Sequence, residues 1–135
     1  NADVHITADD VIVMFHDPLL GEFCRQEDAC TCIFASRAKY DPPRFEQTDS
    51  DGSGSIHDQK YHGEVDQLRT RKAPHQKIPT LQETLDLLMM PANQHVLLNI
   101  DIKVNNDPER LFSIMSRLIS SYPEYDTKLA PRLSA

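Results

Sequence analysis

Two charged side chains stand close together at the end of an apolar run. Asp101 and Lys103 are two residues apart in residues 96–103, so in a strand they share one face. Burying a carboxylate and an ammonium is costly unless they are paired or bound to something. Because parallel strands are usually apolar on both faces, a strand that turns polar only at its C-terminal end indicates a ligand site beyond the sheet. A strand end that emerges into water is the alternative.

The N-terminal part of the chain repeats this pattern. Alternation of polar and apolar residues over 3–7 places Asp3 and His5 on one face of a strand, and the apolar run 11–15 ends in His16. Hard divalent cations prefer carboxylate oxygens, and histidine transfers protons near neutral pH. These residue types predict metal-assisted hydrolysis, although a lone histidine at a strand end is often simply exposed.

Three helices are predicted around these strands. One covers residues 61–70, a second begins after Thr80, which forms a capping-box pattern with Glu83, and a third begins at Asp107-Pro108. Their apolar positions are Val65 and Leu68, then Leu81, Leu85 and Leu88, and then Leu111, Met115, Leu118 and Ile119. With a strand pair before the second helix and a strand after it, the order is typical of a parallel α/β sheet.

The segment 21–58 shows no clear periodicity, and a loop of this length in a compact domain is commonly functional or disordered. Within it, residues 49–56 match the first eight positions of a calcium-binding EF-hand loop. The twelfth position is Lys60, where a bidentate glutamate is needed. A polar loop is therefore favoured over a calcium site. The cysteines Cys24, Cys30 and Cys32 cannot all pair, and free thiols are favoured over a redox or metal role.

Length and charge limit the classes of protein. The chain has 135 residues, which fits one domain, and its formal net charge of −7 argues against a nucleic-acid partner. No run approaches the roughly 18 apolar residues of a membrane-spanning helix, so no transmembrane segment is predicted.

Four motifs, in order, resemble the glycerophosphodiester phosphodiesterase (GDPD) domain. They are Asp-Val-His-Ile-Thr-Ala-Asp at 3–9, the apolar run that ends in His-Asp-Pro at 16–18, Ile-Pro-Thr-Leu-Gln-Glu-Thr-Leu at 78–85, and Leu-Asn-Ile-Asp-Ile-Lys at 98–103. The resemblance covers about residues 3–103. In its aspartate, Asp101, the last motif resembles the branch of the family that is related to phosphatidylglycerol phospholipase C.

The resemblance implies an α/β fold, a partial TIM (β/α)8 barrel of the PLC-like phosphodiesterase type. The domain would cover residues 1–133, incomplete at both ends, with an irregular insertion at about 21–58. It implies hydrolysis of glycerophosphodiesters or glycerophospholipids with a divalent metal, Mg or Ca, and a lipid substrate would fit contact with a membrane surface. Carried over by position, Asp3 and Asp101 are metal ligands, His16 is one of two catalytic histidines, and Lys103 faces the substrate phosphate.

Two departures from the family pattern predict a fragment that is inactive alone. The His-Arg-Gly motif that supplies the other histidine is absent, and Asn1 stands where the family has a metal-binding glutamate. Mutating a residue that only orients a metal ligand lowers metal affinity or activity roughly 10–100-fold, and losing a ligand itself is expected to cost at least as much. The alternative is a non-catalytic binding module on the same scaffold, with calcium bound through the loop 49–60.

Overall fold

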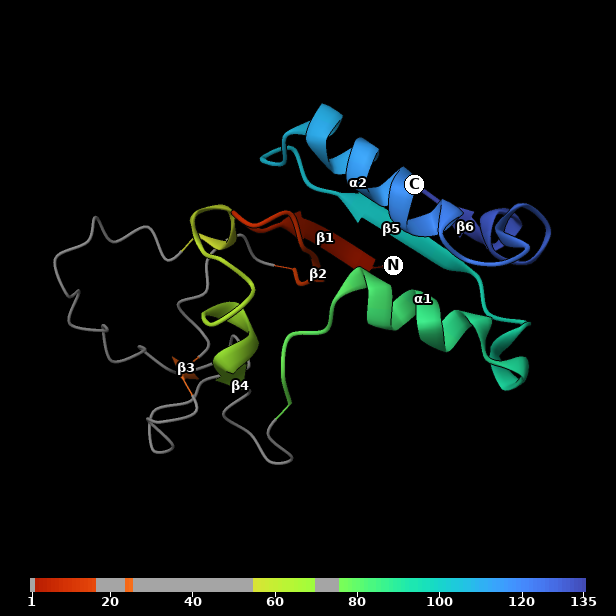
Figure 1. Cartoon of the computed structure of the whole chain (residues 1–135), viewed down its shortest axis with the longest axis horizontal. Coiled ribbons are helices and arrows are strands. Elements are labelled where there is room, and N and C mark those ends of the chain that lie inside the picture. The colour runs from red at the N-terminus through yellow and green to blue at the C-terminus, as the bar shows by residue number, and fades with distance from the viewer. Residues whose placement is uncertain (1, 17–23, 26–54, 70–75) are drawn as a thin grey trace, which may run out of the picture. The chain divides into compact units, whose positions relative to one another are not determined.

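The computed structural model describes residues 2–16, 24–25, 55–69 and 76–135 (Figure 1). The predictions for Asn1, for Cys30 and Cys32, and for most of the segment 21–58 lie outside the described residues. The chain divides into two compact units. The first contains Asn1–Ile6, Asp10–His16 and Pro79–Ala135, and the second contains Thr7–Asp9 and Asp17–Ile78.

A four-stranded sheet in the order β2-β1-β5-β6 forms the centre of the first unit. Its strands are β1 (Ala2–Ile6), β2 (Ile12–Met14), β5 (Leu98–Ile102) and β6 (Leu133–Ser134). β1, β5 and β6 are parallel, whereas β2 is antiparallel to β1. The parallel sheet that the sequence predicted is therefore found for β1, β5 and β6, and β2 makes the sheet mixed. Only a tight turn joins β1 to β2, and a parallel pair needs a crossover of a dozen or more residues.

Helix α1 (Leu81–Met89) begins where the capping box predicted. The Thr80 hydroxyl accepts a hydrogen bond from the Glu83 backbone N–H at 3.1 Å, which satisfies one of the free donors of the first turn. The helix ends at Met89, before the short 3-10 helix η3 (Pro91–Asn93). Its apolar stripe of Leu81, Leu85 and Leu88 is buried. The predicted second helix is confirmed.

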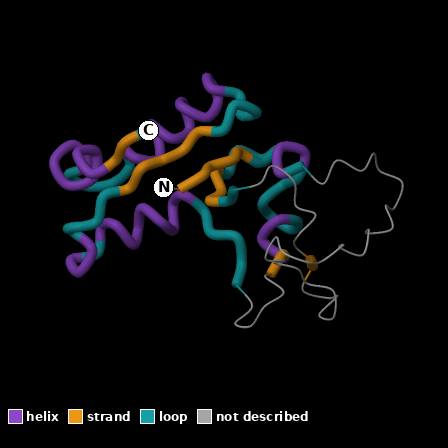
Figure 2. Tube along the Cα trace, turned by 180° about the vertical axis from the view of Figure 1, so that it is seen from behind, coloured by secondary structure: helices purple, strands orange, loops and turns teal. Residues whose placement is uncertain are grey.

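Helix α2 (Pro108–Ser120) is also confirmed. The Asp107 carboxylate accepts a hydrogen bond from the Arg110 backbone N–H at 3.3 Å, and Pro108 occupies the first turn, where no N–H is needed. Both helices lie alongside the sheet in Figures 1 and 2. After α2 the chain forms η4 (Tyr125–Leu129) and η5 (Ala130–Arg132) before β6. The core comprises Val4, Ile6, Ile12, Leu81, Leu85, Leu88, Ile100, Leu111, Met115 and Leu129.

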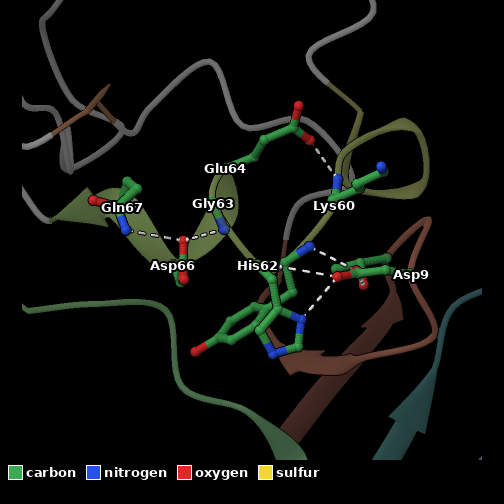
Figure 3. Close-up of polar contacts among 9 residues, drawn as sticks. Asp9, Lys60, His62, Gly63, Glu64, Asp66 and Gln67 are labelled. Carbon is green, nitrogen blue, oxygen red and sulfur yellow. Dashed lines mark hydrogen bonds and ion pairs between the residues drawn. The ribbon is translucent and has the colours of Figure 1, made fainter.

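The predicted helix over residues 61–70 is wrong. In the second unit these positions form turns, the 3-10 helix η2 (Val65–Gln67) and the strand β4 (Leu68–Arg69), which pairs with β3 (Cys24–Arg25). Gly63 has φ +85°, a left-handed conformation that breaks a helix. The Asp66 carboxylate also accepts a hydrogen bond from Gly63 N–H at 2.9 Å, so a side chain competes with helical bonding (Figure 3).

The apolar positions expected of that helix are buried nevertheless. Val65 is fully buried and Leu68 is 8% exposed. Before them lies the 3-10 helix η1 (Ile56–Asp58), which Ser55 caps through its hydroxyl. Among the helices of the described residues, none combines the length and the apolar character needed to cross a bilayer.

Candidate active site

Asp3 and Asp101 lie side by side on neighbouring parallel strands. β1 and β5 pair with Asp3 opposite Asp101, so their side chains leave the sheet on the same face. Lys103 follows two residues later on that face. Its Nζ lies 2.5 Å from an Asp3 carboxylate oxygen and 2.8 Å from an Asp101 carboxylate oxygen. The structure therefore brings together three of the four residues that the sequence selected.

These three groups stabilise one another's charged forms. Hydrogen bonding to Lys103, opposed by partial burial, holds the pKa of the Asp3 carboxyl below its usual value. Hydrogen bonds to Asp101 and then to Asp3 raise the pKa of the Lys103 ammonium. The side chains of Asp3 and Lys103 are 20% and 28% exposed, so the cluster can be reached from solvent. At neutral pH it carries two negative charges and one positive charge.

His16, the fourth residue, is exposed and follows β2. Its positive form contributes to the lowered pKa of Asp3, which places its ring within electrostatic reach of the cluster. Two contacts hold its backbone against β1. The Phe15 N–H donates to the Asp3 carbonyl oxygen at 2.9 Å, and the His16 carbonyl oxygen lies 3.3 Å from Nε2 of the buried His5. A carbonyl can only accept, so His5 Nε2 carries the proton of this bond.

Sequence reasoning missed Asn106. It lies in the turn between β5 and α2 with only 6% of its surface exposed, and its carboxamide bonds both to β1 and to the backbone of Lys103. An asparagine before Asp-Pro reads as an ordinary turn residue. No local signal separates it from its exposed neighbour Asn105.

The donor set fits the hard divalent cation that the family motifs imply. Asp3 and Asp101 supply carboxylate oxygens on one face, and the lowered pKa keeps Asp3 ionised. Mg²⁺ is commonly bound through one or two carboxylates, with waters and substrate phosphate completing its coordination. Within residues 2–16, 24–25, 55–69 and 76–135, no group of three or more His, Cys, Asp or Glu side chains could hold a metal ion. Asp3 and Asp101 are therefore two candidate ligands, short of a full set among these residues.

A second polar cluster, in the second unit, surrounds Asp9 (Figure 3). Its carboxylate accepts hydrogen bonds from the Thr7 hydroxyl at 2.7 Å and from the backbone N–H groups of Tyr61 and His62 at 2.7 and 3.2 Å. His62 Nδ1 adds a contact at 2.9 Å. Burial alone would raise the pKa of Asp9, but these hydrogen bonds hold it far below its usual value. Its oxygens are engaged in holding the fold.

The model of the glycerophosphoryl diester phosphodiesterase family matches residues 1–131. The chain belongs to this family. The resemblance read from the four motifs is confirmed at the family level. Neither the curated proteins nor the solved structures gave a match to the chain.

Family membership has implications for both the fold and the activity. The glycerophosphoryl diester phosphodiesterase family implies a TIM-barrel-like α/β fold, and the parallel strands β1, β5 and β6 with α1 and α2 are compatible with part of such a barrel. It is a family of phosphodiesterase-type enzymes whose members generally use divalent metals and act on glycerophosphodiesters. The relation to the phosphatidylglycerol phospholipase C branch stays a prediction.

Proposed function

We propose that Asp3, Asp101, Lys103 and His16 form a phosphodiesterase centre for glycerophosphodiesters or glycerophospholipids that works with a divalent metal, Mg or Ca. The observation that carries the proposal is the Lys103 ammonium, which lies between two carboxylates of neighbouring parallel strands. Paired carboxylates can bind a cation, and the partly exposed Lys103 ammonium beside them can then donate to an anion that the cation also attracts. A metal-bound phosphodiester needs both.

The metal would be held by Asp3 and Asp101. When bound, a divalent cation neutralises charge that develops on phosphoryl oxygens. Its charge would turn the net −1 of the two carboxylates and one ammonium into +1. That value complements the single negative charge of a phosphodiester.

Lys103 would bind and orient the substrate phosphate. An ammonium is a compact charge that hydrogen-bonds phosphate oxygens in any direction. Its two carboxylate partners keep it charged and restrict its long side chain. The side chain is therefore ordered before substrate arrives, which lowers the entropy cost of binding.

His16 would transfer the proton. Its side chain is exposed, its backbone is held against β1, and a positioned histidine typically contributes about 10²–10⁴-fold in rate. One histidine can activate a water molecule, but an alkoxide leaving group also needs a proton. The His-Arg-Gly motif that would bring a second histidine is not among the 135 residues. We therefore expect the isolated chain to release no glycerol phosphate from a natural diester.

An activated diester separates the two parts of this proposal. A nitrophenolate group leaves without a proton from the protein, so a bis(nitrophenyl) phosphate should be hydrolysed slowly by the chain with Mg²⁺ or Ca²⁺. His16→Ala should abolish this turnover. Calorimetric titration of the same chain should detect binding of Mg²⁺ and of glycerol phosphate. If the folded chain fails to bind Mg²⁺, or fails to bind glycerol phosphate, the proposed function is wrong. Rapid, metal-dependent release of glycerol phosphate would instead refute the expected inactivity on natural diesters.

A further inference from the structure

The carboxamide of Asn106 joins two segments that are distant in the sequence. Its Nδ2 donates one hydrogen bond to the Val4 carbonyl oxygen and another to the Lys103 carbonyl oxygen, each at 3.0 Å. Its Oδ1 accepts from the Ile6 N–H at 3.2 Å. All its polar atoms are thus bonded although the residue is nearly buried. A buried amide bonded in this way fixes the groups around it, because breaking one bond leaves a costly unpaired group.

The Asn106 side chain makes the two hydrogen bonds to β1 that the backbone of a paired strand residue would make. The ladder between β1 and β5 ends at the pair Val4 and Ile102, so the next pair in this register would be His5 and Lys103. In a continued parallel ladder, the residue opposite His5 would donate to the Val4 carbonyl and accept from the Ile6 N–H. The carboxamide of Asn106 makes both of these bonds.

Because the Asn106 side chain takes these two bonds, the backbone of Lys103 is not needed in the ladder between β1 and β5. The Lys103 carbonyl oxygen turns instead to Asn106, accepting from its backbone N–H at 3.1 Å as well as from Nδ2. β5 can therefore end at Ile102 without leaving unpaired groups on β1. The position of Lys103 is set relative to β1, the strand that carries Asp3.

We propose that Asn106 is a positioning residue for Lys103. It holds the backbone from which the Lys103 ammonium reaches Asp3 and Asp101, and it has no contact with substrate. The inference rests on the proposed function, since it concerns how the site binds phosphate. Its consequence is selective: anion binding through Lys103 depends on Asn106, whereas cation binding through Asp3 and Asp101 does not.

The test is a double-mutant cycle read by calorimetry. Asn106→Asp keeps the shape of the side chain but removes both Nδ2 donors, and Lys103→Met removes the ammonium. Asn106→Asp should weaken glycerol phosphate binding about tenfold, within the coupling expected for one hydrogen-bonded network. It should change the Mg²⁺ affinity by no more than about twofold, well below the tenfold change expected for the anion. In the Lys103→Met background it should weaken anion binding no further.

Asn105→Asp is the matched control, because it makes the same chemical change at the exposed neighbouring position. It should leave both affinities unchanged. If Asn106→Asp fails to fold, Asn106→Ser retains a hydroxyl donor and serves in the same cycle. Equal losses of anion affinity with and without Lys103, or a parallel loss of Mg²⁺ affinity, would overturn the positioning role. A wild-type chain that binds no glycerol phosphate would instead contradict the proposed function.

Discussion

Asp3 and Asp9 show how similar carboxylates take different roles. Both have a lowered pKa, but for different reasons. Asp9 accepts hydrogen bonds from two backbone N–H groups, which cannot move without unfolding the segment. Asp3 has the Lys103 ammonium, a side-chain group, as its main partner. A lowered pKa therefore does not by itself separate a candidate site carboxylate from one that holds the fold; the two differ in whether their partners are side-chain or backbone groups.

The largest effect should come from neutralising Asp3 or Asp101. We expect Asp3→Asn or Asp101→Asn to weaken Mg²⁺ binding by about 100-fold. Mutating residues that only orient a metal ligand costs about 10–100-fold in affinity, and a ligand should cost at least as much. Calorimetric titration measures it. Asp126→Asn makes the same change at an exposed position and should leave the affinity unchanged. An unaltered affinity in the Asp3 or Asp101 variant would remove that residue from the metal site.

Asp9→Asn should have the opposite profile. The new NH2 group replaces one carboxylate oxygen and faces N–H or O–H donors from which it cannot accept, so we expect the free energy of unfolding to fall by about 1–3 kcal/mol. Urea unfolding gives this value, and Mg²⁺ titration should show no change. The same substitution at Asp3 is the internal comparison. If Asp9→Asn lost metal affinity with stability intact, the two aspartates would have been assigned the wrong way round.

Acid should remove the contribution of Asp9. Its folded-state pKa lies below its unfolded value of about 3.9, so its stabilising effect is complete well above that pH and is lost as the pH falls below it. The difference in unfolding free energy between the wild type and Asp9→Asn should therefore shrink between about pH 5 and pH 2. Urea unfolding over this range measures the difference. A constant difference would mean that the charge of Asp9 is unimportant.

The smallest effect is expected for His62→Ala. The side chain is 77% exposed, so its contact with Asp9 should contribute less than about 1 kcal/mol, while the His62 N–H bond remains. His95→Ala, at another exposed histidine, is the control. A loss as large as that of Asp9→Asn would show that the ring, and not the backbone, holds Asp9 in place.

Local signals predicted the parts of the fold that local contacts determine. Helices α1 and α2 were predicted because Thr80 and Asp107 cap them within their own first turns. Alternation also predicted that Asp101 and Lys103 share a face, since this follows from strand geometry alone. The helix over 61–70 was wrong because Gly63 and the Asp66 carboxylate bond in ways that apolar spacing does not reveal.

Distant contacts decided what the sequence could not predict. Asn106 bonds to Val4, 102 positions away in the chain, and its role depends on where β1 lies in the sheet. The register that sets Asp3 opposite Asp101 is likewise a property of two strands far apart in sequence. The family motifs supplied these residues as a group, but their pairing required coordinates.

The pairing of Asp3 with Asp101 gives the two carboxylates a separation that the backbone dictates. Neighbouring strands run about 4.8 Å apart whatever their side chains, so main-chain geometry sets the width of the proposed cation site. Insertions and replacements in surrounding loops can change which substrates fit the proposed site, yet they leave that width unchanged. Under the proposed function, substrate preference and metal binding can therefore change independently of each other.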